Sequence, residues 1–96
     1  MRMMITARLP VEQGNTTIQN GTLPRVIQST LERIKPESAY FYLENGRRTM
    51  RAVFEMNKQE DMVPAFEPLM WELHAEIELA PVMTAEELQS GFQTMG

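Results

Sequence analysis

The sequence predicts an α+β domain with the element order β-α-β-β-α-β and a short helix at the C-terminus. Residues 3–9 alternate between apolar and polar side chains, as a half-buried strand does, and Pro10 ends the run. An Asn-Gly pair at 45–46 separates two more alternating segments, which is the strongest short signal for a β-hairpin. Apolar residues recur at helical spacing over 23–34 and 62–73.

Composition narrows the classes of function. The 96 residues are short for more than one domain, and they carry a net charge of −4 with no basic run, so we expect neither nucleic-acid nor anionic-membrane binding. With no cysteine and one histidine, disulfides, thiolate nucleophiles and multi-histidine metal sites are excluded within one chain, and we expect no metal and no cofactor. The chain shows no transmembrane-length apolar run and no signal-peptide pattern, which predicts a cytoplasmic location.

The segment after the first strand divides into a polar part and a helix. Residues 11–21 are polar and contain two glycines, which predicts a loop or a single helical turn. Thr22 resembles an N-cap, and Pro24 falls in the first turn, where its missing N–H costs nothing. The helix is expected to end before Pro36.

The hairpin predicts its own register. A two-residue turn at Asn45-Gly46 pairs Tyr40 with Arg51 on one face and Phe41 with Met50 on the other. Polar partners then share one face and apolar partners the opposite face, and a slip of one residue would destroy that agreement.

The second half adds a helix, a strand and a last helix. Asn57 and Glu60 have the spacing of a capping box, and the two prolines of the helix over 62–73 should kink or divide it. Residues 74–82 alternate again as a strand. Thr84 and Glu87 form a second capping box, which opens a helix with apolar Leu88, Phe92 and Met95.

This order is the ferredoxin-like plan, with a four-stranded antiparallel sheet and two helices on one face. The opposite face is expected to collect Met4, Thr6, Arg8, Tyr40, Tyr42, Thr49, Arg51, Val53, Glu55, His74, Glu76, Glu78, Ala80 and Val82. It is more apolar than a water-facing sheet usually is, and it carries opposed charges. Burial against a second copy satisfies both features, so the predicted partner is the chain itself.

The element order and two phrases, residues 67–70 (EPLM) and 81–88 (PVMTAEEL), resemble small uncharacterised bacterial proteins of the dimeric α+β barrel superfamily. The resemblance covers nearly the whole chain, and its motifs are structural. It implies that two sheets pack face to face around a small-molecule pocket. Members of the superfamily include cofactor-independent monooxygenases, muconolactone-isomerase-like enzymes, chlorite dismutase and haem-degrading enzymes. No catalytic motif of a member occurs in this sequence.

Candidate site residues follow from the predicted face. Tyr40 and Arg51 are cross-strand neighbours that could bind an anionic or phenolic ligand together with Tyr42, or could form only a packed structural pair. His74, placed at the start of the last strand, is the candidate acid–base group, with a solvated rim histidine as the alternative. Arg51 could instead be a structural partner of Glu55, Glu76 or Glu78.

Two readings of function remain open. The first is a homodimeric barrel that binds an aromatic or organic-acid ligand, with or without cofactor-independent isomerase- or monooxygenase-like chemistry. The second is a structural dimer without a ligand site. Trp71 lies off the apolar stripe of its helix, so we expect it to contact the last helix or a partner chain, or to be rotated into the core by a kink at Pro68.

Overall fold

A four-stranded antiparallel sheet organises the chain, and the computed structural model describes every residue from 1 to 96. The elements in chain order are β1 (Arg2–Arg8), α1 (Val11–Gln19), α2 (Thr22–Ile34), β2 (Ser38–Glu44), β3 (Arg47–Glu55), a 3₁₀ turn η1 (Gln59–Asp61), α3 (Met62–Leu73), β4 (Glu76–Pro81) and α4 (Ala85–Gln93). The strand order β2-β3-β1-β4 is that of the ferredoxin-like plan.

The β2–β3 hairpin has the register that the sequence predicts. Tyr40 lies opposite Arg51, and Phe41 lies opposite Met50. Asn45 and Gly46 form the two-residue turn with φ values of 51° and 77°. Both angles are positive, as the type I′ turn requires, and this explains the Asn-Gly pair.

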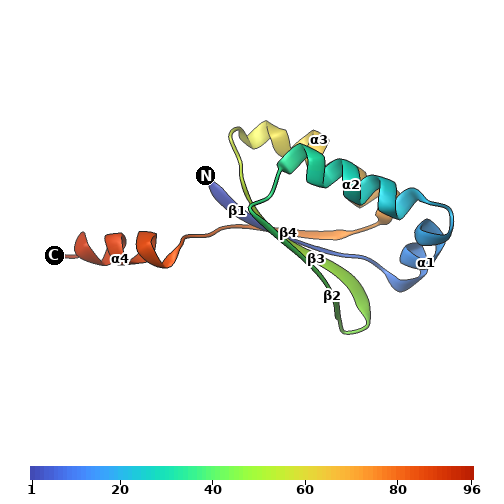
Figure 1. Cartoon of the computed structure of the whole chain (residues 1–96), viewed down its shortest axis with the longest axis horizontal. Helices are drawn as coiled ribbons and strands as arrows, with labels where there is room; N and C mark the ends of the chain where they lie inside the picture. The colour runs from blue at the N-terminus through green and yellow to red at the C-terminus, as the bar shows by residue number, and fades with distance from the viewer.

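Both long helices, α2 and α3, cover the same face of the sheet, and the other face is left open (Figure 1). The cause is the handedness of the two crossovers. The β1–α2–β2 unit moves toward one edge of the sheet, and the β3–α3–β4 unit runs in the opposite direction toward the other edge. A half-turn about the sheet normal relates the two units, so right-handed connections place both helices on one side.

The core lies between this covered face and the helices. Ile5 and Met50 from the sheet, Val26 from α2 and Leu69 and Leu73 from α3 are its largest fully buried side chains. The rings of Phe54 and Phe66 meet edge to face, with centroids 5.6 Å apart. Sheet and helices therefore share one apolar layer, and nothing in the chain covers the second face.

The polar segment after β1 was expected to be a loop or a single turn, and this expectation is wrong. It forms the helix α1, although its residues favour helix poorly. Tertiary contacts outweigh that propensity: the side-chain amide of Gln13 donates to the Glu72 carbonyl at 2.9 Å, and Thr17 packs into the interior. Gly14 is buried against the side chain of Arg48, which occupies the space of a Cβ.

Two helix starts also differ from expectation. Gly21, not Thr22, is the N-cap of α2, and the Thr22 N–H donates to the Asn20 side chain at 2.9 Å. Asn57 and Glu60 form no capping box, because a 3₁₀ turn without a side-chain cap leads into α3. This helix is not divided: Pro64 lies in its first turn, where an N–H has no partner, and the helix continues through Pro68.

Trp71 is 67% exposed, so it is not rotated into the core. It does not meet α4 either, since α4 projects away from the rest of the chain (Figure 1). Of the alternatives that the sequence left open for Trp71, only contact with a partner chain is left, and a dimer through the uncovered sheet faces would not provide it, because α3 lies on the covered side (Figure 1).

Replacing Gly46 by Val should destabilise the fold by about 1 kcal/mol or more, because a β-branched residue disfavours positive φ. A Cβ at Gly46 meets nothing within 4 Å, so the cost would be backbone strain and not a clash. Denaturant unfolding of Gly46→Val and of a control, Asn45→Gly, measures it. The control should keep its stability, and an unchanged midpoint for Gly46→Val would contradict the turn.

Candidate functional site

The uncovered face of the sheet is built from straight cross-strand rows. One row runs Tyr40, Arg51, Thr6, Glu78 from β2 to β4. The row beside it, nearer the hairpin turn, runs Tyr42, Thr49, Arg8, Glu76. These two rows hold both tyrosines of the chain together with Arg8, Arg51, Glu76 and Glu78, so they form the candidate site.

Arg8 joins the two edges of the sheet across this face. It lies on the inner strand β1, and its guanidinium donates to Glu44 of β2 and to Glu78 of β4. Its side chain is only 14% exposed. The hydrogen bonds to Glu44 and Glu78 raise the pKa of Arg8, and the bond from Arg8 lowers the pKa of Glu44. Glu44 therefore stays ionised at neutral pH and favours the folded state there.

The pH dependence of this contact has a definite sign. A carboxylate whose folded-state pKa is lowered contributes stability above its unfolded pKa, and that contribution disappears as the pH falls through the folded value. Glu44 thus stabilises the face at neutral pH and stops doing so in acid.

At the rim of the face, the guanidinium of Arg47 lies 3.5 Å from the carboxylate of Glu76.

Arg51 differs from Arg8 and Arg47 because no carboxylate lies within ion-pair distance of it, although its charge helps to lower the pKa of Glu44. Its Nε donates to the hydroxyl of Thr6 at 3.1 Å, and Thr6 is buried in the sheet. Its guanidinium carbon lies 5.7 Å from the centroid of the Tyr42 ring, within the range of a cation–π contact. The two terminal nitrogens make no hydrogen bond within the chain and remain available as a planar pair of donors.

The sequence left Glu55, Glu76 and Glu78 open as structural partners of Arg51. In the structure each of these carboxylates contacts a different cation. Glu55 meets the Met1 ammonium, Glu76 meets Arg47, and Glu78 meets Arg8. Within one chain Arg51 therefore pairs with none of these three carboxylates, and a packed structural pair with tyrosine stays an alternative. Thr6 and Tyr42 hold the Arg51 side chain instead, and Tyr40 lies directly across from it on β2.

His74 does not lie where the sequence predicted. It is the residue that ends α3, in the left-handed conformation with φ 56°, and β4 begins only at Glu76. The backbone N–H groups of His74 and Ala75 both donate to the Leu69 carbonyl, which is a helix C-cap. The His74 side chain makes no hydrogen bond or ion pair, so the geometry brings Tyr40, Tyr42 and Arg51 together and leaves His74 out.

In a single chain this site is an open surface. Neither Tyr40 nor Arg51 lines any of the three main hollows of the chain, although Tyr42 and Thr49 border one of them. No group of three or more His, Cys, Asp or Glu side chains is arranged to hold a metal ion. The face therefore offers a planar donor beside aromatic rings, and a second surface is needed to enclose a ligand.

Sequence reasoning missed an apolar groove of about 470 Å³ on the covered side, which we name the hairpin groove. It lies between α2 and the β2–β3 hairpin and is lined by Leu9, Ile18, Leu23, Pro24, Ile27, Phe41, Tyr42, Leu43, Arg48, Thr49 and Met50. Strand alternation places Phe41 and Leu43 on the covered face, yet both are exposed. The available signal was Ile18, an apolar residue off the stripe of the following helix.

Comparison with known proteins supports the fold alone. Neither a protein-family model nor a curated protein matches the chain. Among solved structures, it is similar to a formyltetrahydrofolate deformylase from Pseudomonas putida KT2440, with a TM-score of 0.57, 13% identity and 85% of this chain covered. The match spans 29% of the deformylase chain. Such a likeness supports an α+β fold and says nothing about activity.

No helix has the length and apolar character to span a membrane.

Replacing His74 by Gly should leave stability unchanged or raise it by up to about 1 kcal/mol, because glycine adopts the left-handed conformation without strain. Met70→Gly, in the interior of the same helix, is the control and should lose about 1 kcal/mol. Thermal unfolding measures both. Equal losses in the two variants would mean that the His74 side chain makes contacts absent from this structure.

Proposed function

We propose that the chain forms a two-fold homodimer whose uncovered sheet faces oppose each other and enclose a site for a small aromatic or organic-acid ligand. The apolar part of the face supports the dimer. Val53, Met4 and Ala80 form the row next to Arg51, on the side toward α4. An apolar sheet surface of this kind is typical of an interface, and a face that meets its own copy closes at two chains.

The observation that carries the ligand proposal is the unpaired guanidinium of Arg51. A charge enclosed between two sheets without a counterion is costly. Within each copy Glu44, Glu76 and Glu78 already contact an arginine, so none of them is an uncommitted counterion for Arg51 of the second copy. An external anion is therefore the group that best satisfies Arg51, and a carboxylate fits its planar pair of donors.

The neighbours of Arg51 define the chemistry of the rest of the ligand. Tyr40 and Tyr42 flank it from β2 and offer ring surfaces together with two hydroxyl groups. Aromatic side chains of this type pack against planar apolar groups and still donate a hydrogen bond from one end. The combination favours an aromatic or otherwise planar carboxylic acid.

The proposal is one of binding and not of a specific reaction. Cofactor-independent isomerase- or monooxygenase-like chemistry needs a group that accepts a proton near the ligand. His74 was expected to supply it and lies outside the face. Glu44 and Glu78 are engaged by Arg8. A phenol–guanidinium pair could still stabilise a developing negative charge, so a bound acid should also be tested for turnover.

Ligand binding should raise the melting temperature in the presence of benzoate, 4-hydroxybenzoate or succinate, with benzyl alcohol and benzylamine as matched controls. Arg51→Met should weaken binding about ten- to a hundredfold, because it removes a charge-assisted pair of hydrogen bonds. The matched variant Arg47→Met alters a rim arginine and should bind normally. No shift with any acid on the wild-type chain, together with a less stable Arg51→Met dimer, would favour the structural dimer instead.

Dimer formation is a separate prediction. Sedimentation at micromolar concentration should give twice the chain mass, and Met4→Glu or Val53→Glu should shift the chain toward monomer by placing a charge in the interface. Gln28→Glu, on the outer surface of α2, is the control and should not change the mass. A wild-type chain that sediments as a monomer would remove both the enclosed site and the interface.

A further inference from the structure

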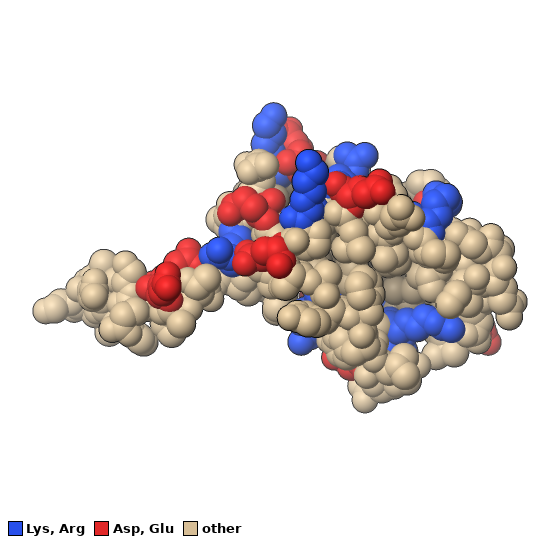
Figure 2. Space-filling view, viewed as in Figure 1, with Lys and Arg blue, Asp and Glu red and all other residues tan.

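The C-terminal helix α4 has an apolar face and nothing to pack against. Leu88 and Phe92 recur at i and i+4 within α4, Met95 follows in the turn just after the helix, and all three are exposed. No residue of α4 is buried. Figure 1 shows the helix standing clear of the sheet and of the other helices, and after Glu87 its surface carries no Lys, Arg, Asp or Glu (Figure 2).

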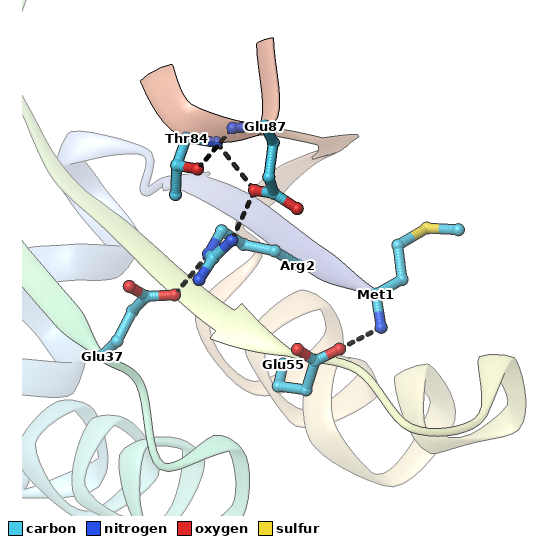
Figure 3. Close-up of polar contacts among 6 residues, drawn as sticks. All are labelled: Met1, Arg2, Glu37, Glu55, Thr84 and Glu87. Carbon is cyan, nitrogen blue, oxygen red and sulfur yellow. Dashed lines mark hydrogen bonds and ion pairs between the residues drawn. The ribbon is translucent and has the colours of Figure 1, made fainter. Parts of the chain in front are cut away.

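The N-terminal end of α4 is nevertheless held by hydrogen bonds and ion pairs (Figure 3). The Thr84 hydroxyl accepts from the Glu87 N–H at 3.1 Å, and the Glu87 carboxylate accepts from the Thr84 N–H at 2.8 Å. Arg2 then donates to Glu87 and to Glu37, each at 2.7 Å. The capping bonds from Thr84 lower the pKa of Glu87, and Arg2 lowers it further. These contacts start the helix and direct it away from its own domain.

A helix of this size is not stable by itself. It has nine residues and contains Gly91. Isolated helices shorter than about 12–15 residues are marginal in water, and an interior glycine weakens them further. The capping box stabilises the first turn only. A partner surface for Leu88 and Phe92 therefore has to come from outside the helix.

The hairpin groove is an apolar surface in need of such a partner. Phe41 and Leu43 on its strand side are exposed, as is Ile18 on its helix side. Arg48 is the single charged residue of its lining; the guanidinium bonds to Asn15 and to no carboxylate. Apolar grooves that accept an amphipathic helix usually take anchors at i, i+4 and i+7.

The two surfaces lie at opposite ends of the same chain. The N-terminal end of α4 lies beside Arg2, where β1 begins. The hairpin groove lies beside Leu9, just past the end of β1. In the structure α4 points away from the groove of its own chain (Figure 1). With the sheets face to face and a two-fold axis across the strands, each α4 lies at the end of the molecule where the partner has its groove.

We propose that α4 of each chain docks its apolar face into the hairpin groove of a second copy. The exchange is reciprocal, so it uses both unpartnered surfaces twice and closes at two chains. No like charges oppose the docking, because α4 has no basic residue and Arg48 is the only charged residue of the groove lining. This inference rests on the proposed face-to-face dimer, goes beyond the proposed ligand site and does not depend on any ligand.

Cross-linking between two variants tests the exchange, and the absence of native cysteine removes background reaction. A chain with Met95→Cys is mixed with a chain with Leu43→Cys, the mixture is allowed to exchange, and it is then oxidised. Mass analysis should find a disulfide that joins the two variants in high yield. Val63→Cys, an exposed residue on the outer surface of α3, replaces Leu43→Cys as the control.

A second pair of variants checks the anchors. Adding Leu88→Ser and Phe92→Ser to the Met95→Cys chain should abolish the cross-link and weaken dimerisation at least tenfold. Gln89→Ser and Gln93→Ser, changed in the same way outside the apolar stripe, should do neither. Because all these side chains are exposed, folding of the domain is not at risk.

The outcomes separate this inference from the proposed function. A dimer whose Met95→Cys links to Leu43→Cys no better than to Val63→Cys overturns the exchange and leaves the ligand site standing. A strong and specific cross-link without any response to organic acids supports the exchange and removes the ligand. A monomer at every concentration overturns both.

Discussion

The placement of both long helices on one face of the sheet is the constraint on which the rest of the structure depends. It follows from two right-handed crossovers related by a half-turn. One side of the sheet is thereby filled by helix side chains around Ile5 and Met50. The other side has no covering element in the chain. Everything of functional interest lies on that side or at the margins where the helices stop short.

The uncovered face is organised electrostatically. Arg8 ties β2 and β4 to the inner strand β1, and Arg47 closes the rim. Glu44, Glu76 and Glu78 each form an ion pair with one of these two arginines. Arg51 keeps its two terminal nitrogens free beside Tyr42. On a face that serves only as an interface, this arginine would be expected to have a carboxylate partner or to be absent. Its free donors beside two tyrosines are the reason to propose a ligand there.

The hairpin and the sheet could be predicted from the sequence because their signals are local and mutually consistent. The Asn45-Gly46 turn and the period-two alternation fix one register, and the register places Tyr40, Tyr42 and Arg51 together. The capping box that opens α4 is equally local. The helix α1 was missed, because its stability comes from contacts with Glu72 and Arg48, which are distant in sequence.

His74 and the hairpin groove were missed for related reasons. Alternation cannot distinguish the first residue of a strand from the last residue of a helix, and a left-handed C-cap gives no sign when it is not glycine. The groove depends on where the helices end above the sheet. Strand parity alone assigns Phe41 and Leu43 to the covered face, although the helices leave both exposed.

A second copy should cover the uncovered face, and hydroxyl-radical labelling of two aromatic residues measures whether it does. In the single chain Tyr40 is 69% exposed and Trp71 is 67% exposed. Each labelling rate is taken relative to the same residue in the unfolded chain. Tyr40 should be strongly protected from labelling at micromolar concentration and should become reactive on dilution. Trp71, on the outer side of the domain, should be reactive at every concentration. Equal reactivity of the two residues at every concentration would contradict coverage of the face by a second copy.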